Sequence, residues 1–257
     1  MFLKVIACEI AARELYYIAA RSSSLVDLEL LPQGYHDTPN RGREEVQKRI
    51  AATPAGKYDA IVLGYGLCGG ILTGLTTAHT PLVVPRAHDC ITFFLGSKER
   101  YQRCFAERPG TYYYTSGWLE YVKRRGDQGA VWGGASLPAG AHQGLGNAYE
   151  EWARKYGEDQ AQYLVEEMGR WAQAYSHGTL IDFEFARPLK LDAQVRRICA
   201  EKGWQYDEIA GELGLLEAML EGRWDESAFL VVRPGQKIVA TYDERVIGAV
   251  DANKRSG

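Results

Sequence analysis

Three cysteines occupy equivalent positions in the first hundred residues of the chain. Cys8 ends the apolar run FLKVIAC, Cys68 follows AIVLGYG, and Cys90 follows LVVPRAH. If these runs are neighbouring parallel strands, their carboxyl ends lie about 5 Å apart along one edge of a sheet. Ligands of open α/β sheets bind at that edge. The sequence therefore predicts that the three thiols converge on one site.

Three thiolates suit a soft metal centre. Thiolate ligands select zinc, copper(I) or iron–sulfur clusters, and three protein ligands with an open fourth position are typical of catalytic zinc. We expect Cys8, Cys68 and Cys90 to bind zinc or a [4Fe–4S] cluster with one iron free for substrate. A metal-free enzyme with a low-pKa cysteine nucleophile is an alternative, but it uses one thiol and leaves two unexplained.

Polar residues beside the thiols are candidates for the chemistry. Arg86, His88 and Asp89 directly precede Cys90 in the stretch PRAHDC. Arg86 could clamp a carboxylate or phosphate, and Asp89 could orient a ligand. We take Arg86, His88 and Asp89 as catalytic candidates. His36, which follows the second expected strand, is an alternative to His88 as a metal ligand, and the sequence leaves that choice open.

Four glycines surround Cys68 in the stretch GYGLCGG, namely Gly64, Gly66, Gly69 and Gly70. They match the spacing G-x-G-x-x-G, but a dinucleotide site also needs an acidic residue about 20 positions later, and Asp89 comes slightly late. Glycines equally allow a close approach of backbone and substrate. We expect these four glycines to line the cofactor or substrate site.

The order of apolar segments predicts an α/β fold with a doubly wound, mainly parallel, Rossmann-like sheet. Two α/β lobes fit equally well. Three parts are expected: residues 1–115 as an N-terminal lobe with the metal site, 116–175 as a glycine-rich loop or lid with a helical insertion, and 176–257 as a C-terminal α/β segment packing on the first lobe. The stretch from 117 to about 147 is expected to be a loop. Cys104 and Cys199 fall inside amphipathic helices and are expected to be core residues.

Composition limits the classes of protein. The chain has 257 residues, 46% hydrophobic and 25% charged, and a formal net charge of −3. It has no broad positive charge for nucleic acid or an anionic membrane, and no apolar run of about 18 residues. Five cysteines are an odd number, so a disulfide framework is not expected. We expect a cytoplasmic protein with a small-molecule substrate and no nucleic-acid or membrane partner; a homo-oligomer is compatible with the sequence.

Several stretches together resemble a known family. LPQGYHDTP, AIVLGYGLCGG, VPRAHDCITFFLGSKERY, GTYYYTSGW, KYGEDQAQYL and FLVVRPGQKI are similar to proteins called domain of unknown function 1638, over nearly the whole chain. The resemblance implies a site at Cys68 and at His88 to Cys90, and supplies no reaction. Members are often encoded near corrinoid-dependent methyltransferase systems of anaerobes, which implies C1 metabolism by association.

These observations lead to three functional hypotheses. The first is a methyltransferase-like enzyme whose metal centre holds a substrate thiol as a thiolate and presents it to a methyl donor, with a corrinoid protein as a candidate partner. The second is a non-catalytic accessory protein that handles a metal or a corrinoid. The third is the metal-free cysteine enzyme.

Overall fold

The structure is a computed structural model, and it describes residues 1–36, 38–125, 153–154, 157–160, 162, 175–241 and 243–253. The chain forms two compact units. Unit 1 comprises Met1–Arg103 and Gly211–Gly257, and unit 2 comprises Cys104–Ala210. Both units combine strands and helices, so the predicted α/β class is confirmed. None of the helices in the described ranges is long and apolar enough to cross a membrane.

Unit 1 is built on a five-stranded sheet with the order β2-β1-β3-β4-β8. The strands are β1 (Phe2–Cys8), β2 (Leu25–Leu31), β3 (Ala60–Gly64), β4 (Leu82–Pro85) and β8 (Phe229–Val232). The first four run parallel to one another, and β8 runs antiparallel to β4. Every residue of β3 and β4 is buried, which agrees with their uninterrupted apolar sequences.

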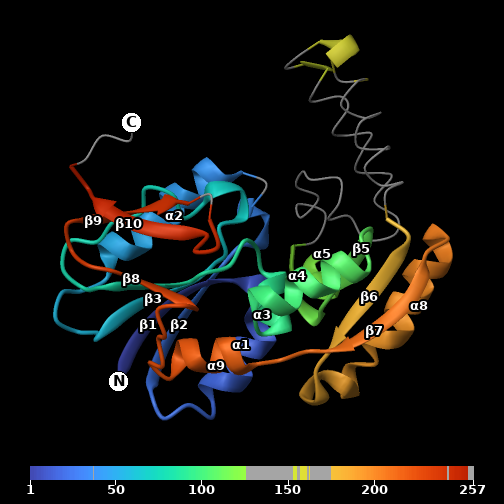
Figure 1. Ribbon diagram of the computed structural model, residues 1–257, viewed down its shortest axis with the longest axis horizontal. Coiled ribbons are helices and arrows are strands. Elements are labelled where there is room, and N and C mark those ends of the chain that lie inside the picture. Colours follow the sequence, from blue (N-terminus) through green and yellow to red (C-terminus); the bar gives the residue numbers. More distant parts are fainter. Residues whose placement is uncertain are drawn as a thin grey trace. The chain divides into compact units, whose positions relative to one another are not determined.

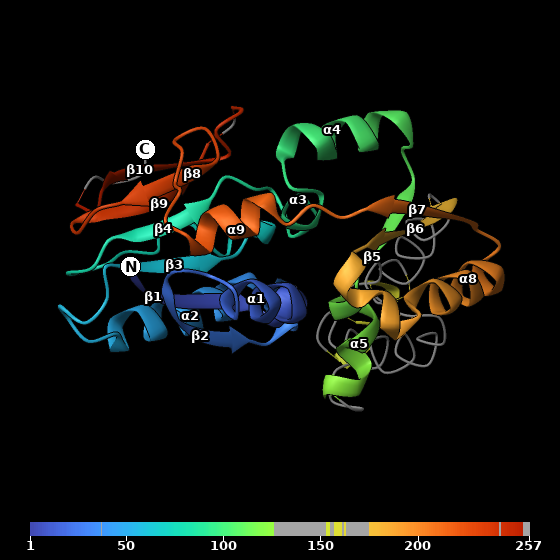
Figure 2. The same ribbon diagram turned by 90° about the horizontal axis from the view of Figure 1, so that it is seen from below.

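Helices and a hairpin accompany this sheet. They are η1 (Glu9–Ala11), α1 (Ala12–Ala19), η2 (Gln33–His36), α2 (Pro39–Ala52), η3 (Cys68–Gly70), α3 (Ile91–Leu95), α4 (Lys98–Glu107), which continues into unit 2, α9 (Gly214–Leu220), and the antiparallel pair β9 (Gln236–Ala240) and β10 (Ile247–Asp251). Figure 1 shows α1 and α9 side by side against the sheet, and Figure 2 shows the same pair in front of the strands. Leu15 and Ile18 of α1 are buried, as the helical spacing predicts.

Unit 2 contains a smaller, fully parallel sheet with the order β5-β6-β7. Its elements are β5 (Thr111–Tyr114), α5 (Ser116–Arg125), β6 (His177–Asp182), η5 (Glu184–Leu189), α8 (Leu191–Lys202) and β7 (Gln205–Ala210). Helix α8 packs along β6 and β7. Its Cys199 is buried and donates from Sγ to the carbonyl of Gly178 at 3.7 Å, so Cys199 is a core residue as expected.

The division of the chain differs from the three parts expected from the sequence. Residues 176–210 belong to unit 2, where β6 pairs with β5, whereas residues 211–257 belong to unit 1, where β8 pairs with β4. The expected loop from 117 onward is wrong for its first residues, because 116–125 form α5. The ion pair of Glu120 and Arg124 at 3.1 Å links successive turns of that helix. Residues 126–147, and most of the expected helical insertion, lie outside the described residues.

Candidate functional site

The structure places the three predicted metal ligands at the same edge of the unit 1 sheet. Cys8 is the last residue of β1, Cys68 begins η3 in the loop after β3, and Cys90 directly precedes α3 in the loop after β4. The strands β1, β3 and β4 are adjacent in this order, and β2 lies on the other side of β1. The chain order therefore reverses between β1 and β3, and such a point is where open α/β sheets bind ligands.

Backbone hydrogen bonds join the two loops that carry Cys68 and Cys90. The N–H of Leu67 donates to the carbonyl of Ala87 at 2.8 Å, and the N–H of Cys68 donates to that of His88 at 2.9 Å. These bonds extend the pairing of β3 and β4 beyond the ends of both strands. They fix the backbone of Cys68 beside the segment that leads into Cys90.

Packing and backbone conformation account for the glycines around Cys68. A Cβ on Gly64 would lie 2.5 Å from the Cβ of Ala7, and a Cβ on Gly66 would lie 2.8–2.9 Å from the backbone of Asp89. Gly69 has φ of 68° and Gly70 has φ of 96°, in the left-handed region that favours glycine. Each of the four therefore has a structural reason, and their role in holding a cofactor stays a prediction.

The conformation of Cys68 is itself uncommon. Its φ is 40°, a value that few residues with a Cβ adopt. Backbone strain of this kind tends to cluster at functional sites. The surrounding loop thus holds the Cys68 backbone in a conformation that is energetically unfavourable for a residue with a Cβ.

Burial and neighbouring charges favour the protonated thiols of Cys68 and Cys90. Burial, followed by the charge of Asp89, raises the pKa of Cys68 from 9.0 to about 12. Burial also raises the pKa of Cys90, with further contributions from the charges of Cys68, Asp89 and Cys8. Cys68 and Cys90 each keep part of their surface exposed, yet protein atoms surround both sulfurs densely. The other two thiols, those of Cys8 and Cys68, are near enough to influence the ionisation of Cys90.

The arrangement of the thiols is not that of a preformed metal site. Among the described residues, no three His, Cys, Asp or Glu side chains are placed as ligands of one ion. The three thiols at one sheet edge are ligand types that suit a soft metal. Their side chains, however, are not positioned to bind the same ion. None of the five cysteines is in a disulfide.

Asp89 and His88 have different surroundings. Asp89 accepts hydrogen bonds from the N–H of Ile91 at 2.9 Å and from the hydroxyl of Tyr101 at 3.0 Å. Burial raises its pKa above the ordinary value of 3.8. His88 is exposed to solvent, and its backbone carbonyl accepts the hydrogen bond from the N–H of Cys68. His36 lies in η2, and its side chain is outside the described part of the chain.

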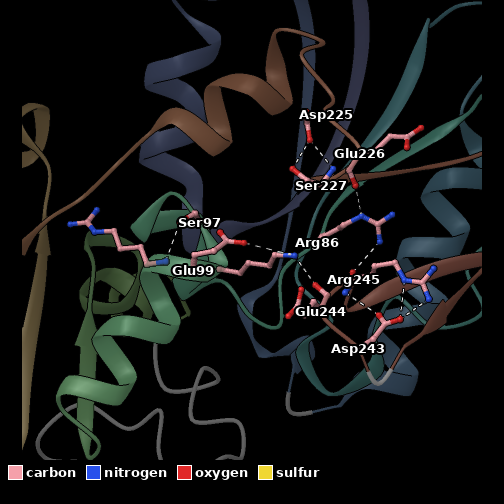
Figure 3. Close-up of polar contacts among 11 residues, drawn as sticks. Arg86, Ser97, Glu99, Asp225, Glu226, Ser227, Asp243, Glu244 and Arg245 are labelled. Carbon is pink, nitrogen blue, oxygen red and sulfur yellow. Dashed lines mark hydrogen bonds and ion pairs between the residues drawn. The ribbon is translucent and has the colours of Figure 1, made fainter.

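The guanidinium of Arg86 is occupied by backbone carbonyls. Its Nε donates to the carbonyl of Glu226 at 2.8 Å and its Nη1 donates to that of Arg245 at 3.0 Å (Figure 3). Nη1 also donates to the carbonyl of Ile247. Burial and the charge of Arg245 lower the pKa of Arg86 below its ordinary value. These contacts tie the end of β4 to the segments that carry β8 and β10. The role of Arg86 as a substrate clamp stays a prediction.

Two residues near the thiols are not among the site residues expected from the sequence. Tyr65 follows β3 directly, is 3% exposed, and lies within electrostatic range of Cys8 and Cys68. Arg43 of α2 donates from Nη2 to the carbonyl of Gly70 at 2.9 Å. Tyr65 stands inside the stretch GYGLCGG and could have been considered there, whereas nothing in the sequence links α2 to that turn.

Comparison with known proteins gives a family and no relative of known activity. A family model described as "Protein of unknown function (DUF1638)" matches residues 30–220, which is most of the chain. No curated protein and no solved structure matches the chain.

Proposed function

We propose that this chain, which belongs to the DUF1638 family, is an enzyme whose three-cysteine site in unit 1 binds a thiophilic metal centre. The observation that carries the proposal is the position of Cys8, Cys68 and Cys90 at the carboxyl ends of the adjacent strands β1, β3 and β4. A lone cysteine is usually a small core residue. Three at the point where the strand order reverses are better explained by a shared ligand.

The proposal includes the finer class of the fold. The order β2-β1-β3-β4, with these strands parallel, is that of doubly wound, flavodoxin-like sheets. In that class the crevice next to the first and third strands receives a small molecule. A cytoplasmic enzyme with a small-molecule substrate is therefore the proposal that agrees with both the sheet and the composition.

Metal binding requires the thiols to move and to lose protons. Their side chains are not placed as ligands of one ion in the described arrangement, so they have to rotate toward one another. The raised pKa values of Cys68 and Cys90 mean that the metal has to displace protons. Asp89, whose carboxylate acts electrostatically on both thiols, is the group that receives a proton in this proposal.

The chain's own residues have separate tasks in this proposal. Zinc, or a [4Fe–4S] cluster with one free iron, would supply a Lewis acid that holds a substrate atom. Tyr101 and the N–H of Ile91 hold the Asp89 carboxylate in place. The bonded loops of Cys68 and His88 keep two ligand positions in register. Transfer of a methyl or other C1 group, with a corrinoid protein as partner, rests on the family resemblance alone.

The metal-free cysteine enzyme is the less favoured alternative. A nucleophilic cysteine needs a lowered pKa, and burial acts in the opposite direction on Cys68 and Cys90. A bound cation would offset this effect of burial. The non-catalytic accessory protein shares the same metal site, and only an activity measurement separates it from the enzyme.

Anaerobic purification followed by elemental analysis and a visible spectrum tests the proposal. We expect zinc, or iron with absorption near 400 nm, at about one centre per chain, and a large loss of metal in Cys8→Ala, Cys68→Ala and Cys90→Ala. Cys104→Ala is the matched control, because this partly exposed cysteine is in α4 and outside the site. Full metal content in any of the three variants removes that residue from the site. Absence of metal from the wild-type chain, also after reconstitution with zinc or with iron and sulfide, would contradict the proposal.

A further inference from the structure

Two buried donors without acceptors lie at the turn that carries Cys68. The hydroxyl of Tyr65 is buried and has no hydrogen-bond partner among the described residues, and the same holds for Nε of Arg43. Tyr65 is 3% exposed. Proteins rarely leave buried donors unsatisfied, because such a group loses water and gains nothing in return.

Both donors belong to one small region of unit 1. Tyr65 packs in a core cluster together with Tyr35, Cys8 and Cys68. Arg43 reaches η3 from α2 through its bond to the carbonyl of Gly70. Tyr65 and Gly70, whose carbonyl accepts from Arg43, both lie in the segment between β3 and the end of η3 that carries Cys68.

The carboxylates identified nearby are bonded elsewhere. Glu9, whose charge acts on Tyr65, accepts a hydrogen bond from the N–H of Gln33 at 3.0 Å. Asp89 is held by Ile91 and Tyr101. Within the described part of the chain, Arg43 forms no ion pair. A charged donor and a neutral donor thus remain for an acceptor from outside the chain.

We propose that Tyr65 and Arg43 form an oxyanion subsite that binds a carboxylate or phosphate group of the substrate beside the three cysteines. The planar guanidinium with several donors suits either oxyanion, and the tyrosine hydroxyl adds a donor on the side of Cys8 and Cys68. That the substrate's reacting atom lies at the cysteines rests on the proposed function. Binding of the anion itself needs no metal.

Binding of simple anions to the full-length chain tests the subsite. Calorimetric titrations with inorganic phosphate and with acetate, at constant ionic strength, are expected to give millimolar binding of at least one. Tyr65→Phe and Arg43→Gln are each expected to weaken that binding about tenfold. Arg41→Gln, an exposed arginine on the same helix, and Tyr16→Phe, an exposed tyrosine, are the matched controls and should bind as the wild type does. The preferred anion identifies phosphate or carboxylate as the substrate group.

Two small thiol compounds test whether the anion binds beside the cysteines. Mercaptoacetate and 2-mercaptoethanol both carry a thiol, and mercaptoacetate also carries a carboxylate. If the subsite takes carboxylates, the metal-reconstituted chain should bind mercaptoacetate more tightly, and Arg43→Gln should remove most of the difference. Equal binding of the two thiols, in a chain that prefers acetate to phosphate, would overturn the link to the cysteines.

Stability separates ligand binding from a structural role of Tyr65. Without anion, Tyr65→Phe should unfold at the same or higher denaturant concentration than the wild type, because it removes an unsatisfied hydroxyl. A lower midpoint would show that the hydroxyl is bonded within the free protein and would overturn the assignment. The subsite is also overturned if the wild type binds neither phosphate nor acetate at concentrations up to about 100 mM. It is likewise overturned if Tyr65→Phe and Arg43→Gln bind the anion as tightly as the control variants do.

Metal content distinguishes this inference from the proposed function. Tyr65→Phe and Arg43→Gln are expected to keep the metal of the wild type. A chain that holds metal but shows no effect of these variants on anion binding overturns the subsite and leaves the metal site standing. A chain without metal whose anion binding depends on both residues supports the subsite and removes the metal enzyme.

Discussion

The backbone N–H of Cys68 donates to the carbonyl of His88 at 2.9 Å, and this bond joins the two loops that carry Cys68 and Cys90. Two candidate ligands thereby belong to one bonded unit of backbone. A change that separates these loops should disturb both thiols at once, even if neither cysteine is replaced.

Gly66→Ala should separate the loops. Its added Cβ would lie 2.8–2.9 Å from backbone atoms of Asp89, which cannot move aside as a flexible side chain can. We expect a loss of about 1–3 kcal/mol in the free energy of unfolding, measured by urea denaturation, and weaker metal binding. Gly214→Ala is the control, because no described atom outside its chain neighbours and its own helix backbone lies within 4 Å of the position that the new methyl carbon would take. The stability of this variant should be unchanged or slightly higher.

Native Cys68 should react slowly with iodoacetamide. Its pKa of about 12, against an ordinary 9.0, reduces the thiolate fraction at pH 8 by about three orders of magnitude relative to the unfolded chain. We expect alkylation of Cys68, followed by peptide mass spectrometry in the metal-free chain, to be at least about 100-fold slower without urea than with it. Fast, selective labelling of Cys68 in the native chain would instead favour the metal-free cysteine enzyme.

Tyr58→Phe should lower stability near neutral pH and not in strong acid. The hydroxyl of Tyr58 donates to Asp27, and this bond, followed by the charges of Lys4 and Lys57, outweighs burial and lowers the pKa of Asp27 below 3.8. A lowered native pKa stabilises the fold above the unfolded pKa, and the stabilisation is lost as pH falls through the native pKa.

The expected loss at pH 7 is about 0.5–1 kcal/mol, modest because the Asp27 side chain is 40% exposed. Urea denaturation at pH 7 and at about pH 2.5 measures it, and the difference from wild type should shrink at the lower pH. The exposed Tyr16→Phe serves as the control. A difference that is the same at both values of pH would mean that ring packing, and not the bond to Asp27, is responsible.

Arg86→Ala should loosen the C-terminal strands of unit 1. The side chain donates to the carbonyls of Glu226, Arg245 and Ile247, so its removal should cost about 1.5–3 kcal/mol. Hydrogen–deuterium exchange is expected to rise in β8 and β10. Arg233→Ala, an exposed arginine directly after β8, should leave exchange unchanged. Unchanged exchange in Arg86→Ala, together with loss of substrate binding, would favour the role of a substrate clamp.

Local patterns were enough to predict the framework of the site. The uninterrupted apolar runs of β3 and β4 are typical of strands buried on both faces, and the three cysteines at strand ends predict one sheet edge. Each expectation depends on a local pattern, namely an apolar run and the residues that directly follow it. The order of the strands and the ends of β1, β3 and β4 agree with them.

Contacts between distant residues could not be predicted in this way. Arg43 meets Gly70 because α2 packs beside η3, and no spacing in the sequence encodes that approach. Arg86 looked available for substrate because it follows an apolar strand, but its acceptors lie more than a hundred residues later in the chain. The same limit explains the domain boundaries, since residues 176–257 read as one α/β segment although they divide between two units.

The discontinuity of unit 1 has a consequence for synthesis. Strand β4 is complete at Pro85, but its partner β8 begins at Phe229, after all of unit 2. At about 5–20 residues per second, the ribosome takes on the order of ten seconds to supply that partner. During this interval the apolar edge of β4 is open to pairing with other chains. A nascent chain halted before Phe229 should therefore be a preferred client of chaperones that protect exposed strands.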